Sequence, residues 1–438
     1  MGSYVPNTKE QQAQMLGAIG LNSLGDLYVD VPQNMILQNG PEIPSGKSEL
    51  ETRRFMEALA DKNTVFNTVL RGAGAYNHYI PSMVKSIVSK DEFITAYTPY
   101  QAEISQGILQ AIFEYQSMIC MLTGMDASNA SVYDGATAAA EALSMCRDRK
   151  RSKAVVSACV NPQVLDTMRT YSFGFGTELI VAPQKDGVTD IDALKELLDG
   201  ETASFYMQQP NFYGIIEDAN ALGEVAHAVG AKFIMGVNPI SLAIIKTPVE
   251  CGADIAVGEG QPLGMPLSFG GPYLGFMACK EKMIRMLPGR IVGETTDNRG
   301  QRAFVLTLQA REQHIRREKA SSNICSNEAL CALTASVYLT TVGGEGLAEV
   351  ATQCISKAHY AATEISKIPG FALRYGGEFF HEFMTEYPIS ADIVNKALAE
   401  NGILGALPYE GGLLWCFTEM VSKEEIDRVV EIVKEAAK

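Results

Sequence analysis

Three segments of the chain combine residue types that could do chemistry. In the first, residues 96–101 (AYTPYQ), Tyr97 and Tyr100 flank a proline in a polar loop. A tyrosine hydroxyl on a fixed loop can bind a phosphate or a ring substituent, but the two rings could equally anchor the loop on the core. In the second, residues 132–140 (VYDGATAAA), small residues open a helix, which either exposes N–H groups to an anion or only allows close packing.

The third segment, residues 311–323 (REQHIRREKASSN), is rich in positive charge. Its basic and histidine residues are Arg311, His314, Arg316, Arg317 and Lys319. A charge run of this kind is usually a solvated helix face. Here it lies in a chain of net charge −15 and is followed by Ser321 and Ser322, which favours contact with an anion or a partner.

The composition argues against several other classes of chemistry. Acidic residues outnumber basic ones by 51 to 36, which argues against binding of nucleic acid. The nine cysteines form no CxxC pair and no cluster with histidine at zinc-ligand spacing, so we expect reduced thiols, no metal and a cytoplasmic location. Residues 258–275 hold six glycines but no GxGxxG, GKS or GKT motif. We expect no secretory signal and no membrane span.

The elements that must position these segments follow from the hydrophobic pattern. Residues 105–122 and the stretch that begins after residue 135 have helical spacing. Short β-branched runs then alternate with helices, which indicates an α/β domain with a largely parallel sheet. These runs are residues 154–160, 178–182, 203–208, 232–237, 254–258 and 273–279. After Pro288 the alternation stops, and we expect a helical stretch through residues 311–323 that leads into helices over 327–365.

The two ends of the chain differ from this middle part. We expect an N-terminal helical arm with loops over residues 1–90, including helical spacing at 5–30 and 49–70. The large α/β domain should cover residues 91–330. Residues 331–438 should form a small C-terminal α+β domain, with a strand pair at 371–384, a helix from 391, a strand near 413–419 and a closing amphipathic helix from 423.

Taken together, these motifs resemble the glycine decarboxylase (P-protein) family of the glycine cleavage system. The resemblance lies in residues 96–107 (AYTPYQAEISQG), 122–142 (LTGMDASNASVYDGATAAAEA), 288–325 (PGRIVGETTDNRGQRAFVLTLQAREQHIRREKASSNIC) and 417–427 (FTEMVSKEEID). It spans nearly the whole chain. By length and motif content the chain is similar to the first subunit of the split, two-chain form of this enzyme, glycine dehydrogenase (decarboxylating), EC 1.4.4.2.

The resemblance implies a fold-type I transferase-like large domain that uses pyridoxal phosphate (PLP). Such a site needs a lysine to hold PLP and an acid beside its pyridine nitrogen. No lysine occurs between Lys246 and Lys280, and Pro262 stands near the expected position. The acid is also missing, because Met235 stands near its expected place. We therefore expect a vestigial site in this chain, with no catalytic residue of its own and with PLP held covalently by the partner subunit.

Active sites of this fold lie between two subunits, so the chain can still contribute residues to its partner's site. The resemblance assigns Tyr97 and Tyr100 to the partner's PLP pocket. It also assigns Ser321, Ser322 and Asn323 to the loop that reaches the partner's PLP phosphate. His314 and Arg316 would be neighbours of that site or of the channel for the lipoyl arm.

The implied reaction involves three proteins. With the PLP-bearing second subunit, in an α2β2 heterotetramer, glycine would lose carbon dioxide and pass its aminomethyl group to the lipoyl arm of H-protein. Three alternatives remain: a homodimeric scaffold with dead sites, an autonomous PLP enzyme that uses a lysine from elsewhere, and a binding module for lipoylated H-protein. The presence of YTPYQ and REKASSN beside a missing lysine favours the half-enzyme.

Overall fold

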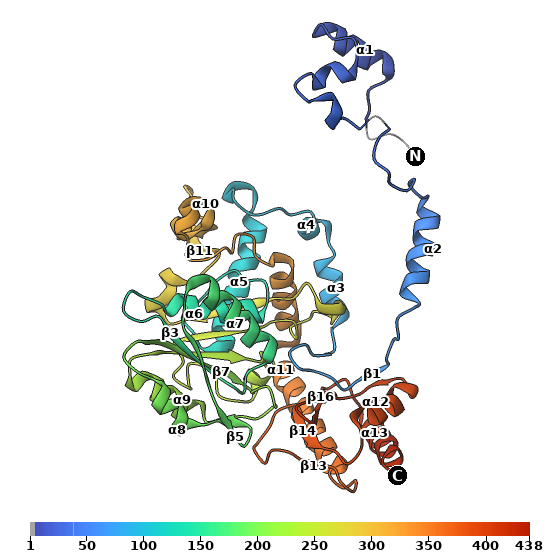
Figure 1. Ribbon diagram of the computed structural model, residues 1–438. Coiled ribbons are helices and arrows are strands. Elements are labelled where there is room, and N and C mark those ends of the chain that lie inside the picture. Colours follow the sequence, from blue (N-terminus) through green and yellow to red (C-terminus); the bar gives the residue numbers. More distant parts are fainter. Residues whose placement is uncertain (1–4, 38) are drawn as a thin grey trace. The chain divides into compact units, whose positions relative to one another are not determined.

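A computed structural model describes residues 5–37 and 39–438, in two units that divide after Thr64. The first unit contains helices α1 (Lys9–Ala18) and α2 (Glu49–Ala60), with 3₁₀ turns at Leu24–Tyr28 and Gln33–Met35 (Figure 1). Both helices begin with a capping box, at Thr8 and at Ser48. None of the described residues up to Thr64 is buried, and α2 ends well before residue 70, so the predicted helix over 49–70 was too long.

The second unit is built on a seven-stranded sheet in the order β2-β10-β9-β8-β7-β3-β4. The strands are β2 (Ala127–Ser128), β3 (Lys153–Ser157), β4 (Leu179–Ala182), β7 (Thr202–Gln209), β8 (Lys232–Val237), β9 (Ile255–Glu259) and β10 (Gly275–Cys279). The pairs from β4 through β9 are parallel, and β10 pairs antiparallel with both β9 and β2. The predicted α/β domain with a mostly parallel sheet is confirmed. A small hairpin, β5 (Gln184–Lys185) and β6 (Val188–Thr189), lies outside the main sheet.

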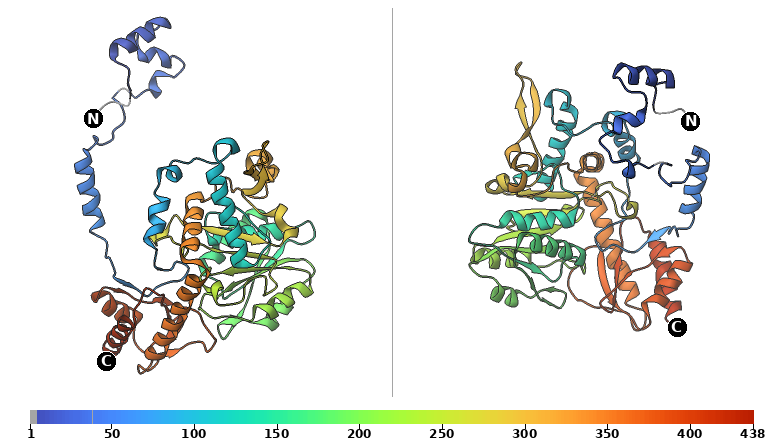
Figure 2. Two further views of the ribbon diagram at one scale, coloured as in Figure 1. Left: turned by 180° about the vertical axis from the view of Figure 1, so that it is seen from behind. Right: turned by 45° about the horizontal axis from the view of Figure 1, so that its top comes forward.

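Helices cover both faces of this sheet (Figures 1 and 2). Helices α6 (Gly135–Cys146) and α7 (Pro162–Phe175) pack on one face, with Tyr206, Ile234 and Val257. Helices α5 (Gln106–Thr123), α8 (Ile191–Leu197), α9 (Ala219–Ala228) and α11 (Ala329–Ile365) pack on the other, with Phe205 and Met235. Neighbouring residues of a strand point to opposite faces, so both faces of these strands are apolar and buried.

The region after Pro288 differs from its prediction. Residues 291–307 form a hairpin, β11 (Ile291–Thr296) and β12 (Arg302–Thr307), which was not foreseen from the sequence. The charged segment that follows contains only one turn of helix, α10 (Gln313–Arg316), between 3₁₀ turns at Gln309–Arg311 and Arg317–Lys319. Leu308 and Arg317 have positive φ angles of 51° and 54°, which interrupt a continuous helix. The predicted helical stretch through 311–323 was therefore wrong.

The C-terminal part is the expected α+β domain. Its antiparallel sheet has the order β13 (Ala372–Leu373), β14 (Glu382–Glu386), β17 (Gly412–Cys416), β16 (Leu407–Tyr409), and it packs with α12 (Ala391–Glu400) and α13 (Lys423–Ala436). Strand β1 (Thr68–Val69) pairs with β15 (Ile403–Leu404), so the chain enters along this domain. Helices α3 (Ser82–Val88) and α4 (Asp91–Ile94) follow. The division at residues 90 and 330 stays a prediction.

Among the described residues, none of the helices combines the length and apolar character that a bilayer-spanning segment needs.

Candidate functional site

A cavity of about 530 Å³ lies at the carboxyl ends of the parallel strands. Residues near the ends of β7, β8 and β9 line it, together with loop residues 71–76 and the start of α6. Ligands of open α/β sheets bind at this edge, because the strand ends and the helix N-termini meet there. The cavity is therefore the place to test for a cofactor site in this chain.

Strand β8 contributes no acid to this cavity. Met235 is fully buried and packs in the core on the opposite face of the sheet. The next two residues of β8, Gly236 and Val237, line the cavity. A Cβ atom at Gly236 would collide with the hydroxyl of Tyr206, so this tyrosine fills the space that a longer side chain at Gly236 would need. Asn238, which follows the end of β8, also lines the cavity.

The turn after β9 is held by a glutamine and contains Pro262. Pro262 is buried and carries no amino group. The side chain of Gln261 donates to the carbonyl oxygens of Tyr76 (2.9 Å) and Met265 (2.8 Å) and accepts from the N–H of Tyr76 (2.8 Å). These bonds fix the turn against the loop that closes the cavity.

The N-terminus of α6, which the sequence suggested as an anion site, already has backbone N–H groups that donate to carboxylates of the protein. Glu259 accepts the N–H of Gly135 (3.0 Å) through Oε2, and those of Gln261 (2.9 Å) and Leu274 (3.0 Å) through Oε1. Asp134 accepts the N–H of Thr137 at 2.7 Å. Burial raises the pKa of Glu259 to about 7, although the three backbone N–H groups oppose this shift. The protein thus supplies its own anion at the N-terminus of α6.

The tyrosine loop forms a second polar region. Tyr97 is 84% exposed and Tyr100 is 48% exposed. Cavities of about 340 Å³ and about 660 Å³ adjoin this loop, and residues 96–98 line both. The Tyr100 hydroxyl accepts a hydrogen bond from the buried Arg290 at 2.9 Å, and the His314 ring lies edge-on to the Tyr100 ring with centroids 6.1 Å apart. The structure therefore brings Tyr100 and His314 together.

The serine loop lies beside this tyrosine. The Sγ atom of Cys325 is 4.0 Å from the Tyr100 hydroxyl. Ser321 and Asn323 are exposed, whereas Ser322 turns inward and donates to Glu141 of α6 at 2.9 Å. Arg316 is exposed, and its Nε donates to the Ala310 carbonyl.

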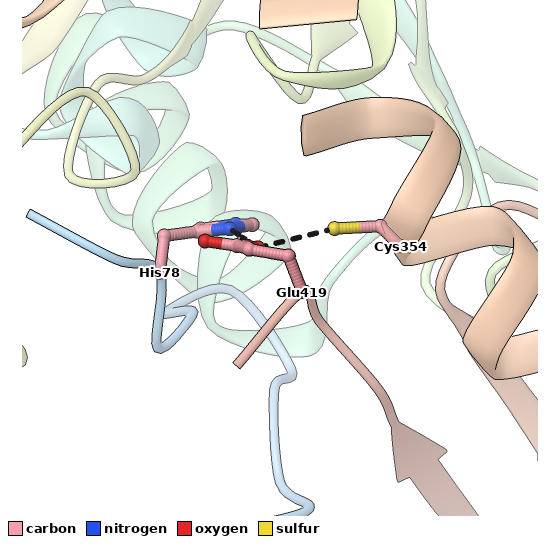
Figure 3. A group of neighbouring side chains, drawn as sticks. All are labelled: His78, Cys354 and Glu419. Carbon is pink, nitrogen blue, oxygen red and sulfur yellow. Dashed lines mark hydrogen bonds and ion pairs between the residues drawn. The ribbon is translucent and has the colours of Figure 1, made fainter. Parts of the chain in front are cut away.

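One cluster was not foreseen from the sequence: His78, Cys354 and Glu419 (Figure 3). Their donor atoms lie within 4.8 Å of one another, a set that could suggest a metal site. His78 Nδ1 is 2.7 Å from Glu419 Oε2, and Cys354 Sγ donates to the same oxygen at 3.4 Å. Hydrogen bonds therefore account for this arrangement.

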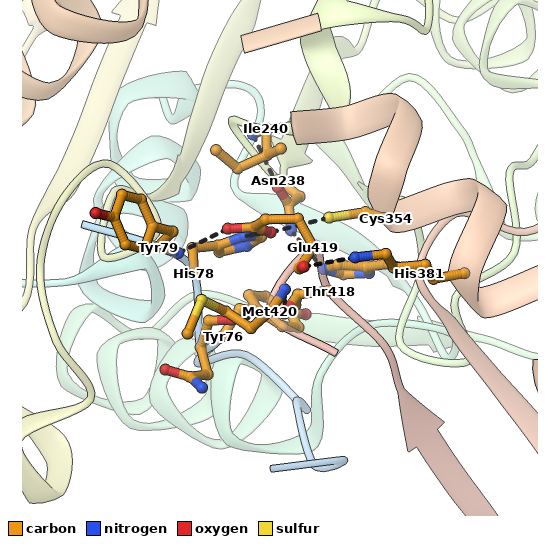
Figure 4. Close-up of polar contacts among 12 residues, drawn as sticks. Tyr76, His78, Tyr79, Asn238, Ile240, Cys354, His381, Thr418, Glu419 and Met420 are labelled. Carbon is orange, nitrogen blue, oxygen red and sulfur yellow. Dashed lines mark hydrogen bonds and ion pairs between the residues drawn. The ribbon is translucent and has the colours of Figure 1, made fainter. Parts of the chain in front are cut away.

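Tyr76 and Asn238, which line the 530 Å³ cavity, lie near this cluster (Figure 4). Asn238, which lines the cavity, lies 3.3 Å from the Nε2 atom of His381, and the His381 ring packs 4.5 Å from that of Tyr76. Burial alone would raise the pKa of Glu419. The hydrogen bond and the charge interaction with His78 lower this pKa by more, so it lies below its ordinary value. The network ties the loop at 76–79 to α11 and to the C-terminal domain.

Comparison with known proteins assigns the chain to a family. The model of the glycine cleavage system P-protein family matches residues 2–433. The chain belongs to this P-protein family. It is 50% identical over 438 residues to the probable glycine dehydrogenase (decarboxylating) subunit 1 of Desulfitobacterium hafniense, covering 98% of each chain. The protein of the same name from Moorella thermoacetica is 50% identical and covers 99% of each chain. The expected enzyme class, EC 1.4.4.2, and the likeness to subunit 1 are confirmed.

Solved structures agree with the P-protein assignment. The crystal structure of glycine decarboxylase (P-protein) of the glycine cleavage system, in inhibitor-bound form, matches with a TM-score of 0.93 at 40% identity, over 99% of this chain and 100% of that one. The sphingosine-1-phosphate lyase of Burkholderia pseudomallei matches at 16% identity with a TM-score of 0.67, over 92% of each chain, which shows the fold alone. The expected fold-type I architecture is confirmed.

The P-protein chain's own cavity does not fit PLP, the cofactor that this fold implies. None of the described residues that line the cavity is a lysine, so the lining offers no amine to hold PLP covalently. Tyr206 fills the space beside Gly236, so no acid can stand there. The Gly135 N–H group, which could bind a phosphate, is bonded to Glu259. No catalytic step is therefore assigned to this cavity.

Four residues that shape these regions were not foreseen from the sequence. They are Glu141, Glu259, Arg290 and Glu312. Glu141, Arg290 and Glu312 are buried and Glu259 is half-buried, and acidic or basic residues are rarely buried unless they are paired. Sequence alone gives no sign of their burial, because it depends on contacts that form only in the folded chain, such as those of Glu141 with Ser322 and of Arg290 with Tyr100.

Proposed function

We propose that this chain is the half of a two-subunit glycine decarboxylase that does not hold PLP, and that it completes the active site of a PLP-bearing second subunit. The reaction is the decarboxylation of glycine and transfer of the aminomethyl group to the lipoyl arm of H-protein. The full-length likeness to proteins named subunit 1 supports the need for a second subunit. PLP would supply the electron sink that stabilises the carbanion left by decarboxylation.

The observation that carries this proposal is the contrast between two regions of one chain. The lining of the cavity at the strand ends includes no lysine among the described residues, and Glu259 bonds the Gly135 N–H group that could otherwise bind a phosphate. Tyr97, Tyr100 and Ser321 nevertheless lie in loops where these residues are exposed. A hydroxyl group on these exposed loops does not reach the chain's own cavity. It is available to bond a ligand that another subunit holds.

The roles of individual residues follow from this placement. Tyr97 and Tyr100 donate hydrogen bonds toward the partner's PLP and its bound glycine. Ser321 and Asn323 are exposed and can contact the PLP phosphate, while Ser322 supports the loop through Glu141. His314 and Arg316 border the site or the path of the lipoyl arm.

The assembly would be an α2β2 heterotetramer in the cytoplasm. In it, residues 1–90 act as an arm, residues 91–330 as the large domain and residues 331–438 as the small domain. The net charge of −15 leaves nucleic acid outside the expected partners. Lipoylated H-protein is the mobile partner that receives the aminomethyl group.

The test is reconstitution from separately purified subunits with PLP and lipoylated H-protein. The measured rate is the exchange of labelled carbon dioxide into the carboxyl group of glycine. Exchange should need both subunits, and borohydride reduction followed by mass spectrometry should find PLP on the second subunit only. The variant Y100F should slow exchange, while the control Y79F, at another exposed tyrosine, should not.

Two results would contradict the proposal. Exchange and a reduced PLP adduct from this chain alone would mean that it is an autonomous enzyme. Undiminished exchange by the second subunit without this chain would instead favour a scaffold or a binding module for H-protein.

A further inference from the structure

We propose that Arg290, with Glu312 beside it, is a positioning residue that orients Tyr100 and His314 for the partner's active site. This inference rests on the proposed function, in which Tyr100 faces the partner. Arg290 and Glu312 lie within the 288–325 motif, but the sequence assigned neither of them a role.

Arg290 is held rigidly under the tyrosine loop. It immediately precedes β11, and its carbonyl oxygen accepts the N–H of Ala130 at 2.8 Å. Its side chain is only 1% exposed. The guanidinium donates to the Tyr100 hydroxyl at 2.9 Å and lies 4.9 Å from the centre of the Tyr100 ring. Two separate contacts, a hydrogen bond and a cation–π contact, therefore fix one side chain.

The direction of the hydrogen bond decides what Tyr100 can do. A guanidinium has only donors, so the Tyr100 oxygen must act as the acceptor. The hydroxyl hydrogen then remains free to point outward and to donate to an acceptor on a ligand. The only other nearby partner among the described residues is the Sγ atom of Cys325, a weak acceptor at 4.0 Å. Arg290 thus turns Tyr100 into an outward-facing donor.

Glu312 completes the arrangement on the other side of Arg290. Its carboxylate is buried, 4.0 Å from Arg290 Nε and 3.4 Å from His314 Nδ1. Neither carboxylate oxygen, nor Arg290 Nε, has a hydrogen-bond partner within the described part of the chain. A carboxylate with no bonded partner of its own costs stability when it is buried, so its charge contacts with Arg290 and His314 must offset part of this cost. Glu312 also fixes its backbone, because its carbonyl accepts the N–H groups of Ile315 and Arg316.

The two side chains that this pair orients share a boundary. His314 contacts the Tyr100 ring edge-on, and its Nδ1 faces Glu312, so its Nε2 points away from the carboxylate. Arg290 itself lines the 340 Å³ cavity beside Tyr97. The Tyr100 ring therefore packs against the buried positive charge of Arg290. The His314 ring lies beside the buried negative charge of Glu312.

The test is a double-mutant cycle in the reconstituted enzyme, with Y100F, R290Q and the double variant. R290Q should lower kcat/KM for glycine by roughly 10- to 100-fold, the size expected when a side chain near the chemistry is misplaced. The double variant should be no slower than Y100F, because Arg290 acts through Tyr100. R290K, which keeps the charge but loses the planar fork, should recover only part of the rate.

The matched control is R302Q. Arg302 also lies 4.9 Å from an aromatic ring, that of Phe304, and it pairs with Glu294, but it is exposed on the β11–β12 hairpin. This variant should leave the rate unchanged. A second measurement, independent of activity, is the ¹⁹F NMR titration of fluorotyrosine placed at position 100. Arg290 opposes the rise in the pKa of Tyr100 that burial causes, so R290Q should raise this pKa further.

The outcomes separate this inference from the proposed function. If Y100F slows exchange but R290Q does not, or if the two effects simply add, the positioning role of Arg290 is wrong while the proposed function stands. If Y100F has no effect, the placement of Tyr100 at the partner's site fails first. Thermal unfolding of each variant identifies any loss of fold, and R290K then replaces R290Q in the cycle.

Discussion

The variant E141Q should make the protein more stable at alkaline pH and change it little at acidic pH. Glu141 lies on α6, is 2% exposed and accepts a hydrogen bond from Ser322. Burial raises its pKa from the ordinary value of 4.5 to about 7, and the bond from Ser322 only partly opposes this. A glutamine of nearly the same shape keeps the accepting oxygen but cannot ionise.

The expected size follows from linkage. A carboxyl group whose pKa is higher in the folded state binds its proton more tightly there, so folding loses stability as pH rises from 4.5 to 7. The full cost, about 3 kcal/mol, is present above pH 7 and absent below pH 4.5. The advantage of E141Q over the parent chain in free energy of unfolding should therefore be about 2–3 kcal/mol larger at about pH 8 than at about pH 5.

The assay is urea unfolding of the full chain at both pH values, followed by circular dichroism. The control is E345Q, at an exposed glutamate of α11, which should show no such pH-dependent gain. If the difference between E141Q and the parent chain is the same at both pH values, Glu141 is not the buried acid described above, and the reasoning fails.

Three further predictions test the closed cavity and the small domain. P262K should give no borohydride-reducible PLP adduct by mass spectrometry, because Glu259 still bonds the Gly135 N–H group; an adduct at the new lysine would contradict this. G135A should lower stability in urea by roughly 1–3 kcal/mol, since its Cβ would lie 2.8 Å from the backbone nitrogen of Glu259; an unchanged midpoint would refute it. W415L should cost roughly 2–4 kcal/mol on thermal unfolding, as the fully buried indole fills the small domain and donates to Thr385; a cost near zero would count against this packing.

The fold was largely predictable because its signals are local. Each strand of the parallel sheet is a short apolar run between helices. This pattern can be recognised in the sequence without knowing which strands lie next to it in the sheet. The β11–β12 hairpin was missed because its strands end in polar residues and their outer ends are exposed, so they lack a continuous apolar face. The segment 311–323 was overestimated as helix, because its composition suits a helix while the positive φ angle of Arg317 interrupts it.

The candidate sites were only half predictable for a different reason. Tyr97, Tyr100 and Ser321 stand out as residue types in unusual runs. Their supports do not, because Arg290 bonds a residue 190 positions away and Glu141 bonds one 181 positions away. A buried charge is recognised by what surrounds it, and those surroundings exist only after the chain has folded.

The cost of burying Glu141 suggests why its carboxylate is useful in the assembled enzyme. A charged acceptor holds the Ser322 hydroxyl more strongly than an amide would, and Ser322 in turn accepts the N–H of Ile324. The loop is thereby fixed on both sides of Asn323, which the proposed function places at the partner's PLP phosphate. E141Q should therefore slow carbon dioxide exchange in the reconstituted enzyme most at about pH 8, where the parent carboxylate is ionised and the variant is also most stabilised. A variant that gained stability with no loss of rate at that pH would show that the loop needs no charged support.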